Sequence, residues 1–429
     1  MASVLISFVG NQDPVSDGTR EDGSIISLVR HLMANQQAVQ RVILLYTTGA
    51  SGTAERAELT QGWLTDAPFH FAPSAVDLIS VGEELSHDPV NLWLAVQVAQ
   101  RGLGVALAAA DRLEINGSSG TPVMKSAWSI LQAAGYAPKS RLWQVRNPKE
   151  QQPGQARVFE SNIQVLRQAF DIRAIRQQLQ DYNYVGGLTT LRTAGLATPT
   201  LEALLTYGHR RLSLDFGGAK DALKGLGTAS MQPWRSSVEV LLQRDALALM
   251  QEAYFNGVVE LKNRQFSDFL VRVSQFLEMA LEHFVSQQLD QRPSLPKGFD
   301  ETEAFWRHLS QNRPQLYQFL QDSKFKSYPL RLDGFPNRPT LLAILRYGQF
   351  PQLADLEFLG ACCEQRNRYI HQFEGISDLS DANAILQALR RILEHLGLQE
   401  LTNPFNQLND AISQLLESTF PAANQPLLG

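Results

Sequence analysis

The sequence contains little that would suit membrane insertion or secretion. No apolar run in its 429 residues approaches the ~18–20 residues of a membrane-spanning helix. The N-terminal segment MASVLISFVGNQD has no Lys or Arg before Arg20, and its apolar stretch stops at Asn11. We therefore expect a first β-strand there rather than a signal peptide. The only cysteines, Cys362 and Cys363, are neighbours and cannot form a disulfide framework, so we expect a cytoplasmic protein.

Several common functional motifs are also missing. No G-x-G-x-x-G follows a predicted strand, and the nearest imitation, Gly102-Leu103-Gly104, lacks the third glycine. There is no G-x-x-x-x-G-K-[ST] loop, no H-E-x-x-H and no C-x-x-C. These absences argue against a Rossmann dinucleotide enzyme, a P-loop NTPase and a standard zinc site. We expect no metal site and no cofactor.

The charge balance restricts the possible partners. A formal net charge of −5 argues against a protein that coats nucleic acid, and we expect no stable DNA binding. The basic residues are 29 Arg and 9 Lys. This bias is compatible with a local phosphate site, because guanidinium groups bind phosphate in a planar, bidentate way.

Residues 1–150 have the pattern of an α/β domain. Apolar runs of strand length alternate with helical periodicity, which predicts a parallel sheet with helices on both faces. The expected strands are Ser3–Val9, Arg41–Tyr46, Ala75–Val81, Arg112–Asn116 and Arg141–Arg146, and the expected helices are Ser24–Gln37, Thr53–Leu64, Asp88–Ala110 and Pro122–Ala134. A strand over Gly102–Ala110 is the alternative, because two glycines weaken the third helix.

The remainder of the chain has a helical pattern. The polar segment Asn147–Gln155 is interpreted as a linker that ends the α/β domain. Residues 151–236 form a helical intermediate region, in which Val158–Gln180 is amphipathic and 185–235 is glycine-rich and hard to assign. Residues 237–429 form an all-α domain without a fixed-period repeat or a convincing strand. Its expected helices are Val238–Asn256, Val259–Gln287, Glu301–Asp322, Thr340–Tyr347, Leu353–Phe373, Asp381–Leu396 and Asn406–Ser418.

A candidate anion site lies between the fourth predicted strand and its helix, in the segment Asn116–Pro122 (NGSSGTP). Thr121 suits the N-cap of the helix, and Pro122 suits its first position. The small residues before the cap present backbone N–H groups and two hydroxyls at a helix N-terminus, which carries partial positive charge and binds anions. The candidate ligand-binding residues are Ser118, Ser119, Gly120 and Thr121. An ordinary capped turn is the alternative.

Two further features extend this candidate site. Lys125, one turn into the same helix, adds a positive charge. The loop Gly10–Pro14 follows the first strand and opens at the same carboxyl edge of the sheet, where ligands bind in open α/β folds. Gly10 and Asn11 therefore join the candidate ligand-binding residues, although a simple turn also explains this loop.

A candidate catalytic set lies in a predicted helix, at Arg366-Asn367-x-x-x-His371. Asn367 and His371 are four residues apart and share a face, whereas Arg366 is about 140° round from His371. The chemistry that fits is RNA cleavage by the RNA's own 2′-hydroxyl. Histidine exchanges protons near neutral pH, and arginine offsets charge on the phosphate. Two such helices from two subunits would bring both sets to one seam.

This set is more specific than its spacing alone. The chain has eight His but only two Arg-Asn dipeptides, so a chance match is rare. Arg390/His395 has the same Arg-to-His spacing without the Asn, and we interpret it as a chance pair near a helix end. A surface helix with a solvated Arg366 and His371 is the alternative interpretation of the first set.

Together these motifs resemble the CARF–HEPN ribonucleases of type III CRISPR systems, which join a CRISPR-associated Rossmann-fold domain to a helical RNase domain. The loop Ser118–Pro122, with Met124 after it, looks like the family's Ser-Ser-Gly-Thr-Pro ligand loop. The loop Gly10–Asp13 matches the first-strand ligand loop in place. Arg366 to His371 matches the HEPN Arg-x(4–6)-His motif, including the Asn that often follows the Arg.

The resemblance implies an allosteric antiviral homodimer. A cyclic oligoadenylate would bind the CARF domains and switch on the HEPN domains, which cut single-stranded RNA without a metal. Arg366 and His371 would be catalytic and Asn367 would support their geometry. We favour the tetra-adenylate over the hexa-adenylate. Because Asn11 and Gln12 occupy the first loop, self-cleavage of the activator stays open.

Two alternatives remain at this point. One is a nucleotide-sensing regulator whose helical domain only dimerises, with Arg366 and His371 inert. The other is a small-molecule α/β enzyme with a helical cap. The missing G-x-G-x-x-G and the lack of a serine nucleophile elbow weigh against the second alternative.

Overall fold

The computed structural model describes residues 3–108, 112–161, 163–227, 231–290, 294–296, 298–372 and 378–421; side chains at 164, 299 and 365–372 lie outside this description. The chain forms two compact units, the first running to Asp171 and the second from Ile172 to Pro421. Within the described ranges, no helix is long and apolar enough to cross a lipid bilayer.

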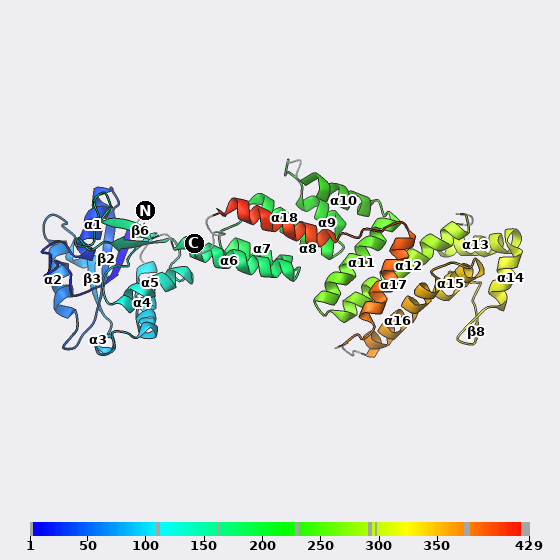
Figure 1. Ribbon diagram of the computed structural model, residues 1–429, viewed down its shortest axis with the longest axis horizontal. Helices are drawn as coiled ribbons and strands as arrows, with labels where there is room; N and C mark the ends of the chain where they lie inside the picture. Colours follow the sequence, from blue (N-terminus) through cyan, green and yellow to red (C-terminus); the bar gives the residue numbers. More distant parts are fainter. Residues whose placement is uncertain are drawn as a thin grey trace. The chain divides into compact units, whose positions relative to one another are not determined.

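The first unit is built on a six-stranded sheet (Figure 1) with strand order β3-β2-β1-β4-β5-β6. The strands are β1 (Ser3–Phe8), β2 (Val39–Tyr46), β3 (Val76–Ser80), β4 (Arg112–Asn116), β5 (Ser140–Val145) and β6 (Val158–Ser161). The first five are parallel, as expected, and β6 pairs antiparallel with β5. The chain direction across the sheet reverses between β1 and β4, which is where open α/β sheets bind ligands.

Helices cover both faces of this sheet, which confirms the predicted architecture. The helices are α1 (Ser24–Ala34), α2 (Ala54–Thr65), η1 (Pro73–Ala75), α3 (Glu84–His87), α4 (Leu92–Leu107) and α5 (Pro122–Ala133). Helices α1 and α2 pack on one face and α4 and α5 on the other. In β1, Ile6 is in one core cluster and its neighbour Leu5 is in the other. Burial on both faces explains why this strand is mostly apolar.

The alternative of a strand over Gly102–Ala110 is wrong, because α4 continues to Leu107. Its N-cap is Asn91, whose side chain accepts a hydrogen bond from the backbone N of Leu94 at 3.1 Å. A Cβ atom at Gly102 would lie 2.8 Å from Cδ1 of Leu45 on β2. The glycine therefore lets the helix lie close against the sheet.

The segment after β5 is not a linker between domains. Asn147–Gln155 connects two paired strands of one sheet, because β6 returns antiparallel with Val158 opposite Val145. The predicted helix over Val158–Gln180 is therefore wrong for its first residues, and α6 spans Gln164–Gln180. Val158 is buried in the sheet's core, a tertiary contact that overrides the helical pattern.

The first compact unit ends at Asp171, past the predicted boundary at residue 150. The second unit is helical, as predicted. Its helices after α6 are α7 (Tyr184–Thr193), α8 (Pro199–Leu212), α9 (Phe216–Ala222), α10 (Gln232–Leu242), α11 (Ala246–Lys262), α12 (Phe266–Gln288), α13 (Phe299–Asn312), α14 (Pro314–Asp322), α15 (Arg338–Tyr347), α16 (Leu353–Gln372), α17 (Ala382–His395) and α18 (Pro404–Thr419). A short hairpin of β7 (Lys324–Phe325) and β8 (Tyr328–Pro329) was not predicted.

Three predicted helices have different limits in the structure. Val238–Asn256 falls across α10 and α11, and Val259–Gln287 falls across the end of α11 and α12. Both breaks contain an arginine in the left-handed region, Arg244 and Arg264, each with φ of 59°. The third, Glu301–Asp322, is divided at Pro314, which begins α14.

The break at Arg244 shares one type of corner with two earlier ones. A residue with positive φ precedes an Asn or Asp that caps the next helix, as at Tyr182-Asn183, Leu214-Asp215 and Arg244-Asp245. The cap side chains accept backbone hydrogen bonds at 2.8–2.9 Å. These caps offset the cost of the left-handed residue and turn the chain sharply between helices.

A buried ion pair joins α8 to α11. The Arg211 guanidinium donates from Nε to Glu252 Oε1 at 2.8 Å, from Nη2 to Glu252 Oε2 at 2.6 Å and from Nη1 to the Tyr207 hydroxyl at 2.8 Å. Its ring neighbour Phe405 belongs to α18, which packs on α8 in this unit. The pair thus fixes three helices in relation to each other.

We predict that Glu252→Ala lowers the free energy of unfolding of the second unit by about 3–5 kcal/mol, because it leaves a buried guanidinium without its carboxylate. Urea titration followed by far-ultraviolet circular dichroism measures this. The matched control is Glu303→Ala, which removes an exposed i,i+4 pair with Arg307 and should cost only about 0.3–0.5 kcal/mol. Equal losses in the two variants would contradict the prediction.

Candidate functional site

The two predicted ligand loops meet at the reversal point of the sheet. Strands β1 and β4 pair in parallel, with Ser7 beside Asn116, so their following loops start side by side. A Cβ atom at Gly10 would lie 2.9 Å from the backbone N of Gly120 and 3.1 Å from Oγ of Ser119. Gly120 itself has φ of +92°, a conformation that favours glycine. The loops therefore touch backbone to backbone, and both glycines are structural requirements.

The carboxylate of Asp13 holds the two loops together. It accepts hydrogen bonds from the Gly10 backbone N at 3.0 Å, from the Ser119 hydroxyl, and from the Ile25 backbone N at 3.3 Å. Asp13 is only 1% exposed. Burial raises its pKa above the ordinary value, and the bonds from Ser119, Gly10 and Ile25 oppose this by stabilising the ionised form. One buried group thus connects the first loop, the fourth-strand loop and the start of α1.

The predicted serines have internal partners. The Ser118 hydroxyl donates to Gln144 Oε1 at 3.0 Å and accepts from the Val145 backbone N at 2.7 Å. The Ser118 backbone N donates to Asn116 Oδ1 at 3.0 Å. Ser119 is buried and bonded to Asp13. Both hydroxyls therefore shape the loop.

The predicted helix cap is confirmed. The Thr121 hydroxyl accepts from the Met124 backbone N at 3.4 Å, and Pro122 occupies the start of α5. The loop thereby ends in a helix N-terminus, whose unpaired N–H groups favour an anion.

A cavity of about 490 Å³ lies beside these loops. Of the predicted ligand-binding residues, Ser118 and Lys125 line it, while Gly10, Asn11, Ser119, Gly120 and Thr121 are not among its lining residues. Polar and charged side chains dominate the lining. The cations are Lys125, Arg146, Lys149 and Arg157, and the one acidic lining residue is Asp22.

These cations differ in how they are held. Arg157 donates to Glu21 and, at 2.7 Å, to the backbone O of Asp22. Arg146 lies 3.9 Å from the ring centroid of Phe159. Within the described part of the chain, Lys125 and Lys149 have no carboxylate partner. Two fixed guanidinium groups and two available ammonium groups suit a ligand with several phosphates.

The sequence analysis missed three of the four cavity cations. Arg146 and Lys149 directly follow β5, whose carboxyl end lies at the same sheet edge as the predicted loops. That position was a usable signal, but the segment was interpreted as a linker. Arg157 comes from the returning end of that loop, next to β6, and no sequence pattern marks it.

The candidate catalytic set lies on α16, which spans Leu353–Gln372 and confirms the predicted helix. The side chains of Arg366, Asn367 and His371 lie outside the described residues. Earlier on the same helix, Cys363 is buried in the core of the unit. Burial raises the pKa of the Cys362 thiol to about 11, so this cysteine is a poor nucleophile at neutral pH.

The rival pair Arg390/His395 has structural partners. Arg390 Nε donates to Glu394 at 2.9 Å, and the His395 ring packs edge-on against Phe350 at 5.3 Å between centroids. Both contacts fit the interpretation of a chance pair. In the described parts of the chain, no three His, Cys, Asp or Glu side chains come together in an arrangement that could hold a metal ion.

A mostly parallel sheet with helices on both faces, followed by a helical unit, is the class of fold that the chain shows. Comparison with solved structures agrees along nearly the whole chain. Enterococcus italicus Csm6, solved bound to cyclic hexa-2′-fluoro-hexa-dAMP, matches with a TM-score of 0.69 at 16% sequence identity, covering 97% of this chain and 100% of that one. No family model and no curated protein sequence matches. The resemblance to the CARF–HEPN ribonucleases, to which Csm6 belongs, is thereby confirmed at the level of the fold.

We predict that Gly10→Ala forces the two loops apart, because its Cβ would meet the Gly120 backbone, and costs about 1–3 kcal/mol. Hydrogen–deuterium exchange should rise in peptides covering both loops. Gly62→Ala is the control: nothing lies within 4 Å of its Cβ position in α2, so stability should increase by about 0.5–1 kcal/mol. Unchanged exchange in both loops would contradict the close approach.

Proposed function

We propose that this protein is a ribonuclease of type III CRISPR defence that a cyclic oligoadenylate activates. The observation that carries the proposal is the combination of one fold with two sites. The fold matches Csm6 over 97% of the chain, a cationic cavity lies at the reversal point of the sheet, and an Arg-Asn-x-x-x-His set lies on α16. The likeness at 16% identity supports the fold, and the two sites support the activity.

The cavity suits a ring of linked nucleotides. Its cations can each bind a phosphate of the ring, and the N-terminus of α5 adds partial positive charge. A symmetric ring binds most simply across a two-fold axis, so the active protein is a homodimer with one cavity from each protomer. The tetra-adenylate stays our prediction for ring size, and the hexameric analogue on Csm6 makes the hexa-adenylate the necessary comparison.

The proposed chemistry needs no group beyond the chain and the RNA. His371 takes the proton from a 2′-hydroxyl, whose oxygen attacks the adjacent phosphorus while the bond to the 5′-oxygen breaks. In the proposed homodimer, the second copy of His371 can protonate the leaving 5′-oxygen. Arg366 offsets the charge that builds on the phosphate, and Asn367 positions the pair. The products are a 2′,3′-cyclic phosphate and a 5′-hydroxyl.

We predict that His371→Ala and Arg366→Ala each lower single-stranded RNA cleavage by ~10²–10⁴-fold, because a positioned proton carrier or charge stabiliser is lost. Cleavage is measured with a labelled oligoribonucleotide in EDTA, with and without cyclic tetra- and hexa-adenylate. Ring binding should persist in both variants.

His395→Ala is the matched control and should cleave normally, since its ring packs on Phe350. Cleavage that depends on a divalent metal, or that proceeds on an all-DNA substrate, would contradict the chemistry. Ring binding by a wild-type protein that never cuts RNA would instead indicate a sensor with an inert helical unit.

We predict that Lys125→Ala and Lys149→Ala each weaken activator binding about 10- to 150-fold, because a charge-assisted contact to phosphate is worth about 1.5–3 kcal/mol. Titration calorimetry with each ring measures the affinity. Lys139→Gln removes a lysine of the same unit that does not line the cavity, and its affinity should equal that of the wild type. Equal affinities in all three variants would place the ring elsewhere.

A further inference from the structure

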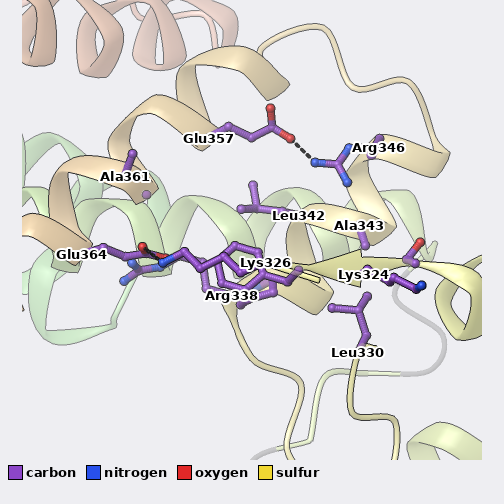
Figure 2. A pocket seen from close by; sticks show the side chains of 14 residues that line it. Lys324, Lys326, Leu330, Arg338, Leu342, Ala343, Arg346, Glu357, Ala361 and Glu364 are labelled. Atoms are coloured by element: carbon purple, nitrogen blue, oxygen red, sulfur yellow. Dashed lines mark hydrogen bonds and ion pairs between the residues drawn. The ribbon is translucent and has the colours of Figure 1, made fainter. Parts of the chain in front are cut away.

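A second cavity, of about 280 Å³, lies in the helical unit beside the helix that carries the candidate catalytic set. Figure 2 shows that α15 contributes Arg338, Leu342 and Arg346, and that α16 contributes Glu357 and Glu364. The β7–β8 hairpin forms a further part of the lining. The volume is close to the lower limit of ~300 Å³ for small-molecule sites, so the cavity suits a single small unit.

This cavity lies along the axis of α16 toward the candidate catalytic residues. Its lining positions on that helix are 357, 360, 361 and 364, which form one face. At ~100° per residue, position 371 continues this face, whereas Arg366 is on the opposite side of the helix. With a rise of ~1.5 Å per residue, the lining lies between about 10 Å and about 21 Å from position 371 along the axis. A strand that reaches His371 can therefore place a nearby nucleotide in this cavity.

The lining is locally basic in an acidic chain. The segment from Lys324 to Arg346 holds five basic residues and one acidic residue, although the whole chain has a net charge of −5. Two of the lining cations are paired, Lys326 with Glu364 and Arg346 with Glu357. Arg338 has only a long ion pair with Glu278, at 3.9 Å, and Lys324 has no carboxylate partner in the described part of the chain.

The guanidinium group of Arg338 is only partly hydrogen-bonded within the chain. Its Nε atom is buried and has no hydrogen-bond partner, and its one carboxylate neighbour, Glu278, is distant at 3.9 Å. Lys324 has no carboxylate partner in the described part of the chain. Buried N–H donors normally have acceptors, and an anion in the cavity would supply one to this atom.

The hairpin presents aromatic rings at the same place. Phe325 lines the cavity and is 39% exposed, and its strand partner Tyr328 is 76% exposed. Lys326 and Ser327 form the turn between them with φ of 47° and 71°. Such a turn usually contains Asn or Gly, so this one is strained, and strain of this kind is concentrated at functional sites.

We infer that this cavity is a substrate subsite, which holds a nucleotide of single-stranded RNA near the cleaved bond, on the face of α16 that also carries His371. Arg338 and Lys324 bind its phosphates, and Phe325 and Tyr328 stack on unpaired bases, a combination typical of single-strand binding. These side chains position the strand and take no part in the chemistry. The inference rests on the proposed ribonuclease function.

The test measures binding of a fluorescent single-stranded RNA by anisotropy in the dimeric full chain, with His371→Ala in every protein so that no RNA is cut. Lys324→Ala, Arg338→Gln and Tyr328→Ala should each weaken binding about tenfold. Arg338→Lys keeps the charge and should recover part of the loss. Lys324 and Tyr328 are exposed, so their variants fold even where a change at Arg338 does not.

Salt dependence separates the two kinds of contact. Loss of one phosphate contact in Lys324→Ala should lower the slope of log affinity against log salt by about 0.7, whereas Tyr328→Ala should lower affinity at every salt concentration with the slope unchanged. In cleavage assays with His371 intact, KM should rise and kcat should stay near the wild-type value, because these residues act on binding.

Arg307→Ala on α13 and Tyr136→Ala in the first unit are the matched controls for lost charge and lost ring, and both should bind RNA normally. If the subsite variants bind as the controls do while the wild type cuts RNA, the subsite is overturned and the ribonuclease stands. Equal losses for double-stranded RNA would also overturn the stacking site. If activated wild-type protein neither binds nor cuts RNA, the proposed function itself fails.

Discussion

The buried carboxylate of Asp13 is the group on which the candidate ligand site depends. It joins the backbone of the first loop, the Ser119 hydroxyl of the second loop and the first turn of α1. A buried charge is tolerated only with several donors, so each of these segments is constrained by the others. The close approach of Gly10 to Gly120 has the same effect, because neither loop can shift without the other. The loops therefore form a fixed base beside the cavity, and a ligand need not spend binding free energy on ordering them.

The α/β half could be predicted well because its signals are local. The buried part of β2 is a continuous apolar run, and the Thr121–Pro122 cap marks the start of α5. The helical half was predicted in type but not in limits. Its corners use Tyr182, Leu214 and Arg244 in the left-handed conformation, where sequence rules expect glycine, so nothing in the periodicity marks the breaks. Strand β6 was missed because its four residues become a strand only by pairing with β5.

The structure brings the two predicted loops together, and the cavity beside them is lined partly by residues that the sequence analysis did not predict. Parallel topology alone brings the ends of β1 and β4 together, which is why two loops far apart in sequence could be assigned to one site. Residue type alone did not indicate these partners. The predicted ligand-binding hydroxyl of Ser119 is bonded to Asp13, and the cavity cations Arg146 and Lys149 come from a segment interpreted as a linker. The order of strands and loops in the sequence indicates which edge of a sheet is the candidate ligand edge. Which side chains are available to a ligand at that edge depends on the hydrogen bonds and ion pairs that they already make within the fold.

The same distinction between paired and available groups explains how an acidic chain can present two cationic sites. Most of its arginines are matched by carboxylates, as Arg211 is by Glu252 and Arg346 by Glu357. A charge paired in this way contributes little field at a distance, so the net charge of −5 says little about any one surface. What identifies a site is a cation that the fold leaves without a partner, such as Lys125 at the first cavity and the Nε atom of Arg338 at the second. The first cavity lies beside the loops that the buried carboxylate of Asp13 holds together, and the second lies beside the strained turn at Lys326 and Ser327. Both features reduce stability, and each constrains the backbone next to a cavity.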